Sequence, residues 1–149
     1  MKLLVVPLLM LAFLSETNAR LTKLWSYQEM FDLADLVAVA KPISTEDTSE
    51  KGKLPEGPAV DVVGVTTKLE IHLVMKGDKA LKDLRLHHYR QQNPKEVLVN
   101  GPDFVSFNFK RPQNYLVFLK KASDGRYVPV AGQTDPAGFS IRKLEGQSY

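Results

Sequence analysis

The sequence predicts a mostly β domain, a small antiparallel β-barrel with one short helix at its N-terminal end. Apolar and polar residues alternate with period two over eleven residues, from 65 to 75, as expected for a half-buried antiparallel strand. Five to seven apolar segments of strand length follow one another with turn residues between them, a spacing typical of β-barrels and sandwiches. One S-x-x-E motif near the start predicts the helix.

The helix motif is Ser26 to Glu29. The Ser26 side chain can accept from the amide three residues on, and Glu29 can reach back to the Ser26 amide. Trp25 before the motif and Met30 after it fit a hydrophobic staple. We expect a helix from residue 27 to about 34, too short to be stable unless it packs on the barrel.

The next two segments differ sharply in composition. Residues 36–40 are all apolar, which predicts a strand buried on both faces that Pro42 ends. Residues 44–58 contain four acids, two lysines, two glycines, two prolines and no aromatic residue. Such a segment has little to bury, so we expect a long exposed loop and a partner-binding surface there.

The alternating strand is predicted to turn one face to the core. Its inward residues are Val65, Thr67, Leu69, Ile71, Leu73 and Met75. Val60 and Val62 upstream are apolar in the opposite phase, and Gly64 lies near the change. A bulge or sharp coil at Gly64 would return the apolar face to the core, as small closed barrels require.

The remaining strands are shorter. In residues 83–89, Leu84 and Leu86 are predicted to point inward, and Arg85 and His87 outward. Further extended segments are predicted at residues 96–99, 104–109, 115–119, 127–130 and 139–141.

The first residues resemble a secretory signal peptide. Lys2 precedes an apolar run at residues 3–14, and small residues precede a predicted cut between Ala19 and Arg20. The run is about a dozen residues, whereas a membrane-spanning helix needs about 20, so no transmembrane span is predicted. We expect a signal peptide at 1–19 and one domain at 20–149, periplasmic or secreted, with an uncleaved N-terminal anchor as the alternative.

Several segments resemble a known superfamily. Residues 33–41 read LADLVAVAK, residues 74–77 read VMKG, and residues 115–132 contain YLVFLK followed by DGRYVPV and a glycine. This pattern resembles the netrin-module-like OB folds, which include the tissue inhibitors of metalloproteinases, and in particular cysteine-free bacterial members. The resemblance implies a five-stranded OB-like barrel with a binding role. The inhibitory mechanism is not implied, because Arg20 stands where those inhibitors have an N-terminal cysteine.

Two other folds fit the strand count less well. A lipocalin-like barrel would need a G-x-W context that Trp25 lacks. An immunoglobulin-like sandwich would need a Cys…Trp…Cys framework, and the chain has no cysteine.

Composition excludes several functions. The absence of cysteine excludes thiol catalysis, disulfide exchange and cysteine metal sites. The net charge of +3 is spread along the chain without a long basic block, which argues against nucleic-acid binding. No G-x-S-x-G elbow and no glycine-rich phosphate loop is present, so we expect no enzyme, although a small hydrolase using paired acids is kept as a minor alternative.

The histidines suggest an alternative function. If their strands pair, His72 and His87 would approach each other on the outer face, where Glu70 could complete a zinc or copper site. His88 is in phase with the inward leucines, which predicts a partly buried histidine. No other cofactor is expected.

The leading functional prediction concerns a basic turn among aromatic residues. Lys110 and Arg111 follow three phenylalanines and precede Tyr115. On an OB fold such residues can stack nucleic-acid bases, but export favours an acidic polysaccharide or protein instead. We therefore expect an exported, non-catalytic binding domain that contacts an extracytoplasmic partner through Lys110 and Arg111.

Overall fold

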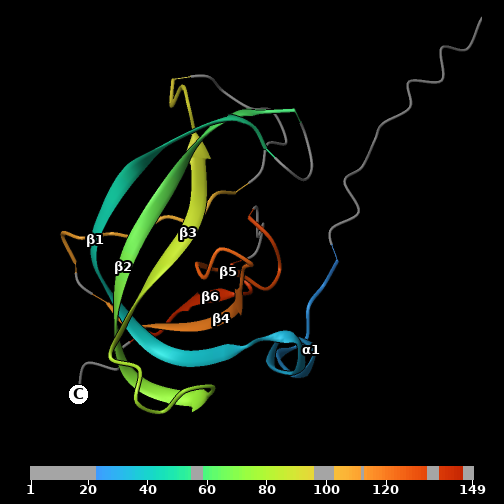
Figure 1. Cartoon of the computed structure of the whole chain (residues 1–149), viewed down its shortest axis with the longest axis vertical. Coiled ribbons are helices and arrows are strands. Elements are labelled where there is room, and N and C mark those ends of the chain that lie inside the picture. The colour runs from blue at the N-terminus through green and yellow to red at the C-terminus, as the bar shows by residue number, and fades with distance from the viewer. Residues whose placement is uncertain (1–22, 55–58, 96–102, 112, 134–137, 146–149) are drawn as a thin grey trace, which may run out of the picture.

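The computed structural model describes residues 23–54, 59–95, 103–111, 113–133 and 138–145 (Figure 1). Its elements, in chain order, are α1 (Tyr27–Leu33), β1 (Leu36–Lys53), β2 (Asp61–Lys76), β3 (Asp83–Gln91), β4 (Tyr115–Lys121), β5 (Tyr127–Pro129) and β6 (Ile141–Lys143). Figure 1 shows β1, β2 and β3 as long curved strands that lie side by side, with the shorter β4, β5 and β6 opposite them.

The strands close into a barrel. The order is β1-β2-β3-β5-β4, and β4 pairs with β1 to complete the circle, while β6 pairs with β4 on one side. All pairs are antiparallel except β3 and β5. The predicted fold class, a mostly β, small OB-like barrel with one short N-terminal helix, is confirmed. The five-stranded closed barrel is neither the eight-stranded lipocalin barrel nor an open sandwich.

The helix forms for the predicted reason. Glu29 N donates to Ser26 Oγ at 3.2 Å, and Ser26 N donates to Glu29 Oε2 at 2.9 Å, so both halves of the capping box are present. Met30 is fully buried in a cluster with Val37 and Phe118, and Trp25 packs against it. The helix is therefore held by docking on β1 and β4, as its length requires.

The prediction of a loop at residues 44–58 is wrong for its described part. β1 continues through Pro42 to Lys53 and pairs with β2 from Thr45↔Thr67 to Lys53↔Asp61. β4 pairs only with residues 36–40 of β1, so Pro42 lies where that edge of the strand is free, a position that tolerates proline. Residues 55–58 lie outside the described part of the chain.

The bulge expected at Gly64 is found in the facing strand β1, whereas β2 itself keeps a regular register with β3 through Gly64. The β1–β2 register shifts between Asp47↔Val65 and Lys51↔Val63. Three residues of β1, 48–50, therefore lie opposite the single residue Gly64. A Cβ atom on Gly64 would lie 2.5 Å from Thr48 Oγ1 and 3.0 Å from Glu50 Cβ. Glycine is required there because the bulge of β1 folds over this position.

The predicted phase of β2 fails near its end. Val39 pairs with Leu73 and Ala40 with Ile71, so His72 is a bulged residue without an opposite partner. The bulge reverses the two faces: Val74 is buried, whereas Leu73 is 57% exposed and Met75 is also exposed.

The core fills the barrel interior. Its buried residues come from β1 to β4 and are Leu36, Ala38, Ala40, Leu69, Ile71, Val74, Leu84, Leu86, Tyr115, Val117 and Leu119. Two predictions are wrong here, a strand at 104–109 and an outward His87. Residues 103–111 contain no strand, although 104–109 was expected to be one, and His87 is buried rather than outward. The segment predicted at 96–99 lies outside the described residues.

Gly77 ends β2 in a conformation that favours glycine. Its φ is +103°, and a Cβ atom there would lie 2.8 Å from the Asp35 carbonyl oxygen. We expect Gly77→Ala to lower the free energy of unfolding by about 2 kcal/mol, from backbone strain and the clash. Urea unfolding measures the change. Gly52→Ala is the control, because nothing lies within 4 Å of its added Cβ and its effect should stay within about 0.5 kcal/mol. Equal effects of the two changes would contradict the prediction.

Candidate functional site

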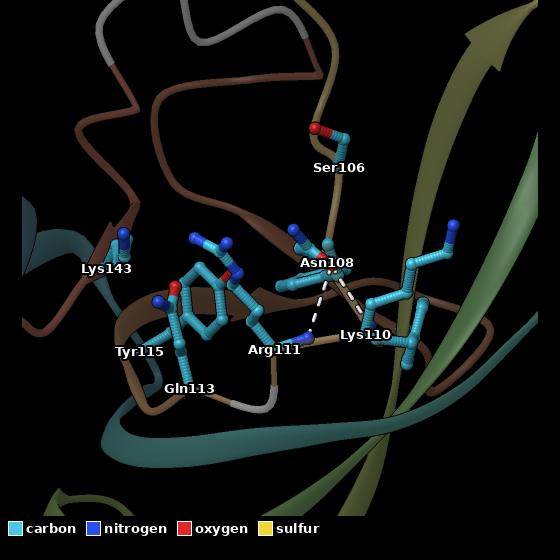
Figure 2. A pocket seen from close by; sticks show the side chains of 9 residues that line it. Ser106, Asn108, Lys110, Arg111, Gln113, Tyr115 and Lys143 are labelled. Atoms are coloured by element: carbon cyan, nitrogen blue, oxygen red, sulfur yellow. Dashed lines mark hydrogen bonds between the residues drawn. The ribbon is translucent and has the colours of Figure 1, made fainter.

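A basic pocket lies where the segment after β3 meets the ends of β4 and β6. We call it the basic pocket, and its volume is about 590 Å³. The residues that define it are Phe107, Lys110, Arg111, Tyr115 and Lys143. Figure 2 shows these cationic side chains around Asn108 and the Tyr115 ring. The two residues predicted from sequence to bind a partner therefore line a concave site.

Asn108 holds the basic turn. Its Oδ1 accepts from the Lys110 amide at 3.0 Å and from the Arg111 amide at 3.3 Å (Figure 2). This side-chain hydrogen bonding replaces backbone pairing that the segment lacks. The turn fixes where the backbone of both cationic residues lies beside the pocket.

The third cation comes from another strand. Lys143 of β6 pairs with Tyr115 of β4, which places it across the pocket from the basic turn. The sequence gives no local signal for this neighbour, because 32 residues separate Lys143 from Arg111 and only the β4–β6 pairing joins them.

A series of aromatic contacts links the pocket to the barrel. Phe107 stands edge-on to Tyr115, with centroids 5.1 Å apart and an interplanar angle of 85°. His88 stands edge-on to the other side of Phe107 at 5.9 Å and 80°. Edge-to-face contacts stabilise aromatic pairs beyond the area they bury. The segment 103–111 is therefore held by its rings.

His88 is anchored inside the barrel. A hydrogen bond of 2.8 Å joins its Nε2 to Thr67 Oγ1, and one of 3.0 Å joins Thr67 Oγ1 to Thr45 Oγ1. Burial lowers the pKa of His88 to about 4, so the ring is neutral at pH 7. The prediction of a partly buried histidine at this position is confirmed, and burial is nearly complete.

The described charged side chains that line the basic pocket are all positive. Three cations line it, and no aspartate or glutamate is among its described lining residues. Phe109 exposes a third aromatic ring beside them. Several cations next to apolar ring surface suit a ligand that carries negative charge and a flat apolar face.

The structure does not bring His72 and His87 together. His87 pairs across the strands with Thr66, six residues before His72 on β2. His72 is 38% exposed and lies 3.6 Å from Glu70, whereas the His87 side chain is only 4% exposed. No group of three or more His, Asp or Glu residues able to hold a metal is found in the described ranges. The geometry thus offers no support for a site that uses both histidines.

His87 instead belongs to a polar cluster that sequence reasoning missed. Its Nε2 lies 3.4 Å from Glu50 Oε2, and the Tyr89 hydroxyl donates to the other oxygen of Glu50. Arg126 Nη1 also lies 3.4 Å from Glu50 Oε2. Burial raises the pKa of Tyr89 to about 12, helped by the Glu50 charge. Burial also lowers the pKa of His87, and the Arg126 charge adds to that effect.

Neither the predicted signal cleavage site nor comparison with known proteins gives further information on function. Ala19 and Arg20, the predicted signal cleavage site, lie outside the described residues. In the part of the chain that is described, no helix is long and apolar enough to cross a membrane. No protein-family model, curated protein or solved structure matches the chain. Function therefore has to be argued from the pocket itself.

Proposed function

We propose that the chain is an exported, non-catalytic binding domain that holds an acidic polysaccharide at the basic pocket. The observation that carries the proposal is that Lys110, Arg111 and Lys143 line one cavity without an acidic lining residue among those described. Carboxylate groups along a polymer would pair with these cations. The apolar face of a sugar ring suits the rings of Phe107 and Phe109.

Export and the superfamily resemblance belong to the same proposal. The apolar N-terminal run and the residues around Ala19 support secretion to the periplasm or beyond. The closed OB-like barrel supports a role of the netrin-module-like kind, in which a rigid barrel presents a binding surface. An acidic polysaccharide is a partner available outside the cytoplasm, where nucleic acid is scarce.

The test measures binding of the protein to three immobilised polymers by biolayer interferometry, at 50 and at 200 mM salt. We expect saturable binding to polygalacturonate, weaker binding to polyglutamate and none to neutral dextran. Affinity should fall as salt increases, because the exposed charges become screened. No binding to polygalacturonate would refute the proposal, and preference for polyglutamate would replace it with an acidic protein partner.

A matched pair of double variants localises the binding. Lys110→Gln with Arg111→Gln should weaken polygalacturonate binding at least tenfold, since two charge-assisted contacts are lost. Lys68→Gln with Arg85→Gln removes the same charge from an exposed cross-strand pair outside the pocket, and should change affinity less than twofold. Equal losses would mean that net charge, rather than the basic pocket, attracts the polymer.

A further inference from the structure

A second pocket opens where β3 and β5 separate. These strands share a single parallel pair, Leu86↔Tyr127, and then diverge. The gap is a cavity of about 420 Å³ between His87 and Tyr89 on one side and residues 128–133 on the other. We call it the seam pocket. Its volume is within the range of small-molecule sites, roughly 300–1,000 Å³.

The seam pocket is separate from the basic pocket. The two share no lining residue. β4 contributes Tyr115 to the basic pocket and Lys120 to the seam pocket. Five residues of strand separate these two positions by roughly 17 Å.

One wall of the seam pocket is cationic. Lys120 pairs across β4 and β5 with Val128, so both side chains lie on the same outer face. Lys120 makes no ion pair in the described part of the chain. Arg126 also lines the cavity, but Asp124 and Glu50 already compensate its charge. Lys120 is therefore the cation best able to accept an anionic ligand.

Part of the lining is apolar and contains Trp25. Trp25 packs against the cluster of Met30 and Val130 and lines the seam pocket. Lys23 Nζ lies over the Trp25 ring, 3.7 Å from its centroid. Apolar lining beside a cation favours a ligand that carries both a carboxylate and a surface of carbon-bound hydrogens.

Gln133 closes the seam pocket with an unmet hydrogen bond. Among the described residues its buried Oε1 has no hydrogen-bond donor, and its Nε2 donates a long hydrogen bond, 3.4 Å, to the His87 carbonyl. A buried amide oxygen without a donor is costly, so a ligand hydroxyl that reaches it is favoured. Turning the Gln133 side chain toward a ligand would break, among its contacts with described residues, the long bond to the His87 carbonyl.

We propose that the seam pocket binds a single uronic acid unit, a sugar that carries one carboxylate and several hydroxyl groups. The carboxylate pairs with Lys120, a hydroxyl donates to Gln133 Oε1, and the ring lies against Trp25 and Val128. This proposal stands apart from the one made for the basic pocket. A free sugar acid can bind here whether or not a polymer binds there.

The chain carries its own reporter for this test. Trp25 is the single tryptophan of the sequence and lines the seam pocket, so its fluorescence responds to a ligand that enters. The full-length protein is titrated with D-galacturonate, and isothermal calorimetry on the same sample measures binding independently of Trp25. We expect a saturable change with galacturonate and at least tenfold weaker binding of D-galactose, which lacks the carboxylate.

Variants separate the seam pocket from other sites. Lys120→Gln and Gln133→Leu should each weaken galacturonate binding about tenfold. Lys121→Gln, on the neighbouring residue that does not line the cavity, should leave it unchanged. The basic-pocket double variant should also bind galacturonate normally, so failure of one proposal is distinguishable from failure of the other. No saturable binding in either assay, or equal affinity for galactose, overturns the proposal.

Discussion

Removing residues 45–52 should abolish cooperative folding. This segment is the distal half of β1 and pairs with β2 as far as Lys53↔Asp61. Its loss leaves the facing backbone groups of β2 without partners, and such groups are costly when they are buried. It also removes Glu50, which contacts His87, Tyr89 and Arg126, so the contacts from this half of β1 to β3 and to Arg126 disappear.

Circular dichroism and thermal unfolding measure the effect of this deletion. We expect loss of the β spectrum or of a cooperative transition, because the combined losses approach the whole stability of a small domain, about 5–15 kcal/mol. The control is Ser49→Ala with Lys51→Ala, which keeps the strand and alters only exposed side chains, and should cost less than about 1 kcal/mol. A deletion variant that unfolds cooperatively near the wild-type temperature would show that the segment is the dispensable loop its composition suggests.

The composition of this segment led to a wrong prediction, because a strand that is held by backbone hydrogen bonds needs no particular side chains. Residues 44–53 are exposed on both faces for most of their length, so no apolar alternation marks them as a strand. What holds them is the β2 backbone, together with contacts such as Arg90 Nε donating to Asp47 Oδ1 at 2.8 Å. Where one face is buried, as around Leu69, the alternation did predict the strand.

Short sequence motifs predicted the structure of their own segments, whereas the positions of other side chains depend on how the strands close into a barrel. The capping box at Ser26 acts on its own neighbourhood and is confirmed, whereas the bulge expected at Gly64 occurs in the facing strand β1. His87 was placed outward by strand phase, but Glu50 and Arg126 come from distant parts of the chain to cover it. The phase of Leu73 changed because a bulge at His72 is set by the partner strand.

In the basic pocket, too, some residues were predicted from neighbouring sequence and others depend on strand pairing. Lys110 and Arg111 were identified from sequence because they are adjacent and stand among aromatic residues. Lys143 was not, because only the β4–β6 pairing brings it to the site. The cavity itself depends on Phe107 packing between His88 and Tyr115, an arrangement of rings from three separate segments.

Acidification from pH 7 to pH 5 should destabilise the fold through His88. The His88 ring is buried, and its pKa is about 4 in the folded chain, against 6.5 when it is exposed. The unfolded chain therefore binds the proton first as the pH falls. The stability that neutral His88 provides is fully present above pH 6.5 and is lost as the pH falls toward 4. Burial lowers the pKa of His87 too, so its contribution has the same sign.

The expected loss is about 2 kcal/mol from His88 alone between pH 7 and pH 5, since one pKa unit corresponds to about 1.4 kcal/mol. Urea unfolding at several pH values in this window measures it. Glu50 and Asp47 have lowered pKa values because Tyr89 and Arg90 hydrogen-bond to them, so their contribution is lost only at lower pH.

His88→Gln isolates the effect, because the glutamine amide can still hydrogen-bond to Thr67 but does not titrate. We expect this variant to be less stable at pH 7, yet to lose about 2 kcal/mol less than the wild type on going to pH 5. His72→Gln, on the exposed part of β2, should follow the wild-type curve. A wild-type free energy of unfolding that stays constant from pH 7 to pH 5 would mean that His88 reaches solvent or a proton acceptor in the folded protein. The aromatic rings that link the basic pocket to the barrel would then be less tightly packed than the Phe107–Tyr115 geometry indicates.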